Sequence, residues 1–390
     1  MSKTVYILGA GFSKSAGGPL QSDIIPQIYK IKHKDFRVEQ YSQIYFKYKR
    51  ALSDLLSNIF FLDKREYKNF PLEDIYSTID RCLLDNLSLG KFGKTRLIEL
   101  RDKINALIIM LMDVKLQYSF FDDSNDHIHD FSNYLIDKKI KSFQLNPNSD
   151  PFTIISTNWD IVIENSLKAI IDIKQGNNVQ DGFLDYCFYV HAYKENEPNI
   201  KIRSGQYWRG KGLYNVKVLK LHGSMNWLQC QRCQRVFITF FEKIAKDEFI
   251  SKPSCRLCNR FTGKMEGSEL KSVLVMPTFL KDLNVFQLKL SWQLAGIELQ
   301  EADNIVFMGY SFPMADFELR QLLARSVRQK TKIEVVLHRN DEPIRWKGVD
   351  KLYQYLPEHR FKSFFGKRDI KFFYNGVEDY ITRLINGEFE

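Results

Sequence analysis

Long apolar runs are missing from this sequence. The longest run near its middle, residues 106–112, is far short of the roughly 20 residues that a membrane-spanning helix needs. The amino terminus also lacks the long apolar core and the small-residue cleavage site of a signal peptide, because the apolar residues 5–8 end directly in a glycine turn. We therefore expect a cytoplasmic protein that does not contact a membrane.

Cysteine is scarce, with six residues in 390. Four of the six form two Cys-x-x-Cys pairs, Cys230/Cys233 and Cys255/Cys258. In a reducing compartment such pairs are typical of metal ligands rather than of disulfides. Four thiolates complete a tetrahedral zinc site and leave no position for water, so we expect a structural Zn²⁺. A redox role for one of the pairs is the alternative.

The sequence contains no internal repeat, no low-complexity tract and no Gly-x-x-x-x-Gly-Lys-Ser/Thr loop, which excludes an ATPase of that class within this chain. Its 57 Lys and Arg residues outnumber its 47 Asp and Glu residues, which gives a formal net charge of +10. A basic balance favours anionic partners such as nucleic acid or a phosphate-bearing ligand. An excess of this size is more often only a solvated surface.

Short apolar runs recur along the chain, and most lead into a polar or glycine-rich turn. Unalternating runs of this length suit strands that are buried on both faces of a sheet. Helical patterns lie between several of them, as at 286–302 and 315–327, which indicates an α/β fold with a doubly wound parallel sheet. The runs cover residues 4–8, 152–155, 216–221, 272–276, 304–308 and 333–337, with 371–374 as a last edge strand.

Two stretches do not show this alternation of short apolar runs and helical patterns. Residues 27–148 are mostly helical in pattern and are interpreted as an inserted helical module, and residues 228–261 hold the cysteine pairs in a second, smaller insert. Ligands bind at the carboxyl ends of parallel strands, so the turns that follow the strands are expected to converge on one cleft. The sheet domain would then consist of residues 1–26, 149–227 and 262–390.

A glycine turn follows the first strand. Gly9 and Gly11 would let the backbone approach a phosphate closely, and the amino terminus of a following helix would favour an anion. The dinucleotide-binding fingerprint would need a third glycine where Lys14 stands. This turn alone therefore leaves nucleotide binding and a purely structural turn equally open.

Longer motifs resemble those of sirtuins, the NAD-dependent deacylases of the silent-information-regulator family. The first is Gly9-Ala10-Gly11-x-Ser13-x-x-Ala16-Gly17-x-Pro19. Three more occur in the sirtuin order, with the cysteine pairs between the second and third of them: Thr157-Asn158-Trp159-Asp160, Leu221-His222-Gly223 and Gly309-Tyr310-Ser311. The resemblance runs from residue 4 to about residue 340 and implies a Rossmann-like NAD-binding domain with a small four-cysteine zinc module.

The resemblance also implies catalytic roles. Asn158 would orient the ribose of NAD and the attacking group, Asp160 would support that geometry, and His222 would be the general base. Such groups suit a bond cleavage that builds positive charge at a ribose. The alternatives are a helix N-cap for Asn158 and a structural histidine at a strand end for His222. The residues expected to contact the cofactor are Gly9, Ala10, Gly11, Ser13, Thr157, Gly309, Ser311 and Asn340.

Other positions depart from the protein-deacylating sirtuins. Leu20-Gln21-Ser22 stands where those enzymes have Phe-Arg, Thr157 where they have Gln, and Met276-Pro277-Thr278-Phe279 where they have a Phe-Gly-Glu peptide-binding loop. The sequence looks more like the divergent sirtuin-like domains of bacterial anti-phage defence, and residues 309–316 also resemble that branch. This resemblance implies an NAD hydrolase that releases nicotinamide and ADP-ribose. A deacylase, or a non-catalytic subunit that binds NAD or nucleic acid, is the alternative.

The same resemblance bears on partners. Related defence domains work as homo-oligomers, and some pair with a ring-shaped DNA-translocating ATPase, which here would have to be a separate chain. Whether the chain contacts nucleic acid directly stays open. Candidates for such contacts or for contacts with a partner are the arginines of the cysteine module, the helical insert and residues 361–374. The alternative is that these regions form ordinary surface or core packing. Glu73 and Asp74 are expected to form a surface pair rather than to face the cleft.

Overall fold

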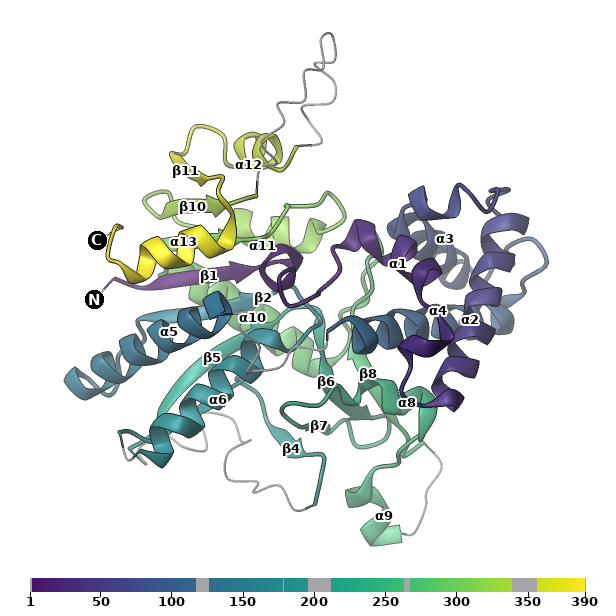
Figure 1. Cartoon of the computed structure of the whole chain (residues 1–390), viewed down its shortest axis with the longest axis horizontal. Helices are drawn as coiled ribbons and strands as arrows, with labels where there is room; N and C mark the ends of the chain where they lie inside the picture. Colours follow the sequence, from purple (N-terminus) through teal and green to yellow (C-terminus); the bar gives the residue numbers. More distant parts are fainter. Residues whose placement is uncertain are drawn as a thin grey trace.

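The structure is a computed structural model. At its centre is a seven-stranded parallel sheet with the strand order β11-β10-β9-β1-β2-β5-β3 (Figure 1). The strands are β1 (Thr4–Leu8), β2 (Phe152–Ser156), β3 (Gly182–Asp185), β5 (Tyr214–Lys220), β9 (Asn304–Met308), β10 (Lys332–Val336) and β11 (Ile370–Phe373). The described residues are 2–116, 126–177, 179–195, 212–262, 267–338 and 356–389.

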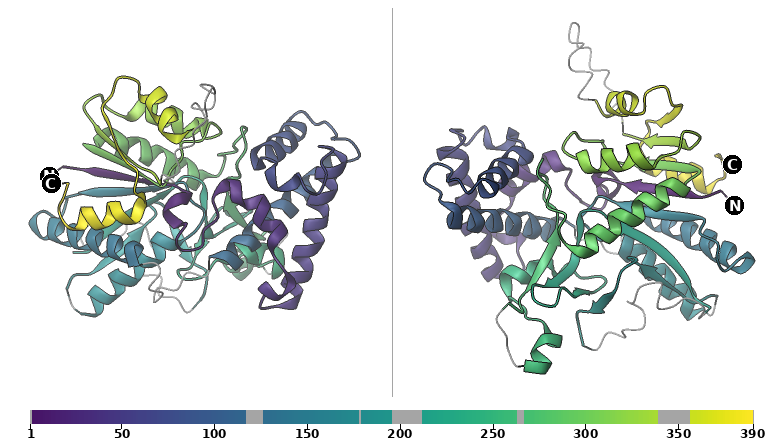
Figure 2. Two further views of the ribbon diagram at one scale, coloured as in Figure 1. Left: turned by 45° about the horizontal axis from the view of Figure 1, so that its top comes forward. Right: turned by 180° about the vertical axis from the view of Figure 1, so that it is seen from behind.

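Helices cover both faces of this sheet (Figures 1 and 2). Tyr6 and Leu8 pack into one apolar core, whereas Val5 and Ile7 pack into the other. Successive side chains of a strand point to opposite faces, so a strand covered on both sides needs an unbroken apolar run. The prediction of a doubly wound parallel sheet is confirmed. The helices are α5 (Asp126–Leu145), α6 (Val162–Gly176) and α13 (Gly376–Ile385) on one face, and α10 (Phe286–Glu301), α11 (Phe317–Ser326) and α12 (Pro357–Phe365) on the other.

A second sheet holds four strands in the order β4-β7-β6-β8. The prediction that residues 272–276 join the parallel sheet is wrong, because β8 pairs antiparallel with β6. The chain turns out of the parallel sheet at Gly223, where φ is +76° and a Cβ would lie 1.8 Å from the carbonyl oxygen of Val273. The strands are β4 (Val190–Ala192), β6 (Gly223–Cys230), β7 (Val236–Ile238) and β8 (Leu270–Leu274).

Four helices form a separate unit beyond the carboxyl end of β1 (Figure 1). Helix α5 also lies within residues 27–148, but it packs against α6 and α13 on the parallel sheet. The limits of the insert at 27 and 148 stay a prediction. No helix in the described ranges is long and apolar enough to cross a membrane. The helices of the unit are α1 (Ile24–Lys30), α2 (Glu39–Asn58), α3 (Leu72–Leu84) and α4 (Lys94–Lys115).

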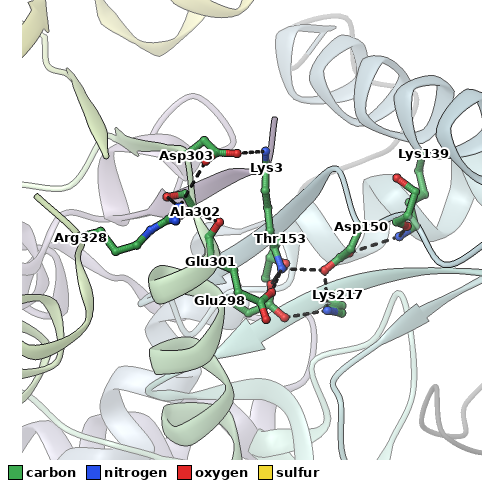
Figure 3. Close-up of polar contacts among 11 residues, drawn as sticks. Lys3, Lys139, Asp150, Thr153, Lys217, Glu298, Glu301, Ala302, Asp303 and Arg328 are labelled. Atoms are coloured by element: carbon green, nitrogen blue, oxygen red, sulfur yellow. Dashed lines mark hydrogen bonds and ion pairs between the residues drawn. The ribbon is translucent and has the colours of Figure 1, made fainter. Parts of the chain in front are cut away.

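A charged network joins α10 to the amino ends of the central strands (Figure 3). Glu298 of α10 lies 2.6 Å from the Nζ of Lys3 and 2.6 Å from the Nζ of Lys217. Asp150 pairs with both lysines, at 3.0 and 2.6 Å. Burial acts to raise the pKa of Asp150, but the lysines, Lys217 foremost, lower it to about 2. The network therefore fixes α10 against β1, β2 and β5 through ionised groups.

Replacing Glu298 by Ala is expected to lower the free energy of unfolding by about 2–4 kcal/mol. Removing one partner of a buried ion pair leaves the other charges desolvated and poorly compensated, and the partial exposure of the lysines (11 and 24%) moderates the effect. Urea-induced unfolding measures the change. Glu301→Ala is the matched control because its carboxylate also pairs with Lys3 but is 58% exposed, and we expect less than about 1 kcal/mol there. Equal losses in the two variants would contradict the assignment.

Candidate functional site

A cavity of about 720 Å³ opens at the carboxyl ends of the central parallel strands. The turns after β1, β2, β5 and β9 line it, as the sequence predicts, and the helical unit forms the opposite wall. Of the residues expected to be catalytic or to contact the cofactor, those on the lining are Ala10, Gly11, Thr157, Asn158, Asp160, His222, Gly309 and Ser311. Gly9 and Ser13 lie behind this lining, and Asn340 falls outside the described residues.

The glycines of the first turn pack against the turn after β9. The amide of Gly11 donates a hydrogen bond to the carbonyl oxygen of Gly309 at 2.9 Å. A Cβ on Gly9 would lie 2.5 Å from the Cα of Tyr310, and a Cβ on Gly309, whose φ is +63°, would lie 2.3 Å from the amide nitrogen of Phe12. These glycines are needed so that the two turns can touch at the floor of the cavity.

A short 3₁₀ helix, Ala10–Ser13, follows the glycine turn. The chain then turns at Gly17, where φ is +84°, and the next α-helix, α1, begins at Ile24. The helix that follows the turn most closely is therefore a 3₁₀ helix, and the expectation that a helix amino terminus here favours an anion stays a prediction.

Asn158 lies on the turn after β2 and is held by the glycine turn. Its Nδ2 donates to the carbonyl oxygen of Gly9 at 2.9 Å and to the Oγ of Ser13 at 3.3 Å. Helix α6 starts four residues later, at Val162, so Asn158 is not the helix N-cap that the sequence left open. Within the described part of the chain no group donates to its Oδ1, which is the atom that remains for a ligand.

His222 follows β5 and is a buried, neutral base. Burial, only partly offset by Asp316, lowers the pKa of its imidazole to about 4. Its Nδ1 lies 3.1 Å from the carbonyl oxygen of Thr157. Because a carbonyl oxygen can only accept a hydrogen bond, the single proton of the neutral ring is on Nδ1. Nε2 therefore carries the lone pair, and among the described residues it has no hydrogen-bond partner.

A buried carboxylate, Asp316, faces this nitrogen. Its Oδ1 is 3.9 Å from Nε2 of His222, accepts a hydrogen bond from the Nζ of Lys281 at 2.5 Å, and its Oδ2 accepts one from the hydroxyl of Tyr310 at 2.6 Å. Burial acts to raise the pKa of Asp316, but its charged and hydrogen-bonded neighbours keep that pKa below the ordinary value. Asp316 is thus an anion, placed to stabilise a proton on His222.

Asp160 shapes the turn that carries Asn158. Its Oδ1 accepts a hydrogen bond from the amide of Val162 at 3.1 Å. Its carbonyl oxygen accepts one from the Nζ of Lys220 at 2.6 Å, and Lys220 forms a fully buried ion pair with Glu164 at 2.7 Å. These contacts join the turn to the end of β5, so that Asn158 and His222 rest on one internal polar support.

Sequence reasoning missed three of these residues or undervalued them. The only signal for Asp316 in the sequence is its place at the end of the run 309–316. Lys281 gave no signal, because its partner is 35 residues away. Glu73 was expected at the surface, but it is half-buried and lines the cavity; burial raises the pKa of its carboxyl group.

The four paired cysteines form a compact cluster. The Sγ atoms of Cys230 and Cys258 lie 3.9 Å apart, those of Cys233 and Cys255 lie 3.8 Å apart, and all four are within 4.8 Å of one another. A tetrahedral zinc ion with Zn–S distances of about 2.3 Å places its sulfurs about 3.8 Å apart. The cluster fits a zinc ion, and four thiolates would leave no coordination position for a substrate.

Cys258→Ser is expected to abolish stoichiometric zinc binding and to lower the Tm by about 5–10 °C, since a structural metal contributes several kcal/mol to folding. Metal analysis of the purified protein and thermal unfolding measure the two effects. Cys82→Ser is the control, because Cys82 lies outside the cluster. Unchanged zinc content in Cys258→Ser would disprove the assignment.

The known proteins that this chain matches are solved structures. No protein-family model matches the chain, and no curated protein does. Three similar solved structures concern Sir2 enzymes. One, on the mechanism and regulation of Sir2 enzymes, has 14% identity, covers 99% of this chain and 91% of its own, and has a TM-score of 0.41. A Sir2 homologue–NAD complex has 14% identity, coverages of 100% and 91%, and a TM-score of 0.41. A Sir2 homologue mutant with 2′-O-acetyl-ADP-ribose has 14% identity, coverages of 99% and 92%, and a TM-score of 0.40.

Proposed function

We propose that this chain binds NAD in the cavity and hydrolyses the nicotinamide–ribose bond, releasing nicotinamide and ADP-ribose. The observation that carries the proposal is the pairing of Asn158 with a neutral, buried His222 whose Nε2 has no partner in the described structure. Both residues line one cavity at the carboxyl ends of parallel strands, where open α/β sheets bind nucleotides. The order of the four sequence motifs supports NAD as the nucleotide.

The chemistry assigns a task to each group. As nicotinamide leaves, positive charge develops at the ribose C1′, and a water molecule adds there and loses one proton. The Oδ1 of Asn158 would hold the ribose or the water, and Nε2 of His222 would accept the proton. Asp316 would then stabilise the imidazolium that forms. The proton leaves to solvent afterwards, so the balanced products are nicotinamide, ADP-ribose and one proton.

We favour hydrolysis over deacylation because of the residues that line the walls of the cavity. Leu20, Gln21 and Ser22 line it on one side, and Met276 and Pro277 line it on another. These are the positions at which the sequence departs from the motifs of protein deacylases. With the acyl-peptide elements replaced, water is the acceptor that the site is best suited to hold.

The sequence resemblance extends the proposal to a cellular role. The chain would be an anti-phage effector that depletes NAD, acting as a homo-oligomer, and a separate ring-shaped DNA-translocating ATPase would be a candidate partner. A binding subunit without catalysis is the second candidate function. It is favoured by the two hydrogen bonds, at 2.9 and 3.3 Å, that occupy both protons of the Asn158 amide, which would suit a fixed structural residue.

Asn158→Ala is expected to lower the rate of nicotinamide release from NAD by at least about 100-fold, because the group that positions the reactants is removed. Chromatographic measurement of nicotinamide and ADP-ribose in the purified protein, without any peptide, tests this. The matched control is Asn165→Ala, an asparagine of α6 that does not line the cavity.

The outcomes separate the candidate functions. Release that depends strictly on an acylated peptide would establish a deacylase and overturn the proposal. NAD binding without release, in the isolated chain and in its native oligomer, would favour the binding subunit.

Asp316→Asn is expected to lower the rate of nicotinamide release by about 10–100-fold, because the developing imidazolium loses its counter-ion.

In the wild type the rate of release should stay level down to about pH 5 and fall only near pH 4, where His222 becomes protonated before the reaction. Asp316 favours the protonated form, so its neutralisation should move this acid limb to lower pH. Glu318→Gln is the control, since Glu318 contacts Lys281 at 3.2 Å but does not line the cavity. An acid limb that stays in place would show that Asp316 does not act through His222.

A further inference from the structure

Positive charge is concentrated in the first part of the helical unit. Residues 27–70 contain ten Lys and Arg residues but only five Asp and Glu residues. This short segment therefore carries half of the net charge of the whole chain, which is +10. Clustering of this kind, rather than the total charge, is the feature that indicates an anion-binding surface.

Two surface hollows lie within this segment. The first, of about 690 Å³, is lined by Lys30, Lys64, Arg65 and Lys68 together with two tyrosines. The second, of about 490 Å³, is lined by Lys49 and Arg50 with His33 and Phe46. No carboxylate lines either hollow.

The two hollows adjoin each other and the cavity through shared lining residues. Ser53 lines both hollows, and Lys68 lines the first hollow and also the candidate active-site cavity. We call the two hollows together the basic groove. Its six cations are Lys30, Lys49, Arg50, Lys64, Arg65 and Lys68.

The cations of the basic groove are not neutralised by the protein. Within the described part of the chain, no ion pair involves any of the six. Two acidic residues of the same segment have other partners: Asp54 pairs with Lys91 at 2.8 Å, and Glu66 accepts a hydrogen bond from the amide of Asp63 at 2.8 Å. The positive charge is therefore available to an external anion.

Two arginines of the cysteine module have partners within the protein. Arg256 and Arg260, which the sequence suggested for nucleic-acid contact, both pair with Glu195, at 3.7 and 3.5 Å. Arg256 also donates to the carbonyl oxygen of Ala192. Arg256 and Arg260 are therefore committed to contacts within the protein, unlike the cations of the basic groove.

We propose that the basic groove binds single-stranded nucleic acid. Such a ligand combines a chain of phosphates with flat bases, and proteins that bind it combine a positive groove with aromatic side chains. The basic groove has Tyr29 and Tyr67 in one hollow and Phe46 in the other, and the Nζ of Lys49 lies 5.3 Å from the ring centre of Tyr29. An acidic peptide would use the cations but not the rings, and a membrane surface would not enter two hollows.

The position of the basic groove beside the cavity means that a bound strand could affect the candidate active site. Because Lys68 belongs to both the basic groove and the cavity wall, a strand that fills the groove ends at the mouth of the cavity. Bound nucleic acid would thus be placed to change the access of a nucleotide to Asn158 and His222. Binding itself depends only on the groove and not on the proposed hydrolysis of NAD.

The test is fluorescence anisotropy of a labelled single-stranded oligonucleotide with the full chain, in the absence of NAD. Lys64→Glu combined with Arg65→Glu is expected to weaken binding at least about tenfold. The slope of log K against log salt should become about 1.4 less steep, since each phosphate contact to a single strand contributes about 0.7. The matched control is Lys330→Glu with Lys332→Glu, which makes the same charge change at exposed positions beside the amino end of β10.

Three results would overturn the proposal: no binding by the wild-type chain, equal weakening by the control pair, or displacement of the oligonucleotide by poly-glutamate as readily as by unlabelled oligonucleotide. The last would identify an acidic protein partner instead. Lys64→Gln with Arg65→Gln repeats the test with a milder change at two exposed positions, and thermal unfolding verifies that the variants are folded. Because NAD is absent, a failure here is distinguishable from a failure of the proposed hydrolase activity.

Discussion

The contact between the turns after β1 and β9 is the constraint on which the site depends. The two strands are neighbours in the sheet, and their turns approach so closely that side chains are not tolerated at Gly9, Gly11 or Gly309. The contact fixes the carbonyl oxygen of Gly9, which in turn holds the amide of Asn158. The glycines thus act on the site through packing as much as through any contact with a phosphate. Lys14 stands where the dinucleotide fingerprint has its third glycine, and it is exposed. The close packing of the two turns therefore does not require a glycine at that position.

Burial of His222 and Asp316 determines what the site can do chemically. In a desolvated pocket a neutral imidazole is favoured over a charged one, and for that reason the pKa of His222 falls. The same low polarity strengthens the attraction between an imidazolium and the nearby carboxylate once a proton arrives. Lys281 and Tyr310 keep Asp316 ionised in advance, so the stabilising charge needs no rearrangement when it is required.

The sequence predicted the parts of the fold that follow from local patterns. Buried parallel strands require unbroken apolar runs, and most of those runs form β1, β2, β5, β9, β10 and β11 as expected. The four-residue strand β3 is too short to give a clear signal. The run at 272–276 has the same composition as a parallel strand, and only its pairing with β6 places it in the second sheet. A pattern of residue types cannot reveal pairing of this kind.

The candidate site was predictable to the same extent. Asn158, Asp160 and His222 stand directly after strands, so topology alone brings them together. Lys281 and Glu73 come from segments without a recognisable motif, and only the packing of the helical unit and of the 281 loop against the sheet places them at the cavity. Their positions depend on long-range contacts that leave no local trace in the sequence.

The two edges of the parallel sheet differ in how their charges are used. At the amino edge, Lys3 and Lys217 are matched by Asp150 and Glu298, and the result is a closed network that holds α10 in place. At the carboxyl edge, His222 has an unpaired nitrogen in the described structure, and the basic groove beside it has cations without carboxylate partners. A buried polar atom without a partner carries a cost in stability, and Nε2 of His222 has this cost at the edge where open α/β sheets bind ligands. This cost is the physical argument for placing the candidate site at this edge and not at the other.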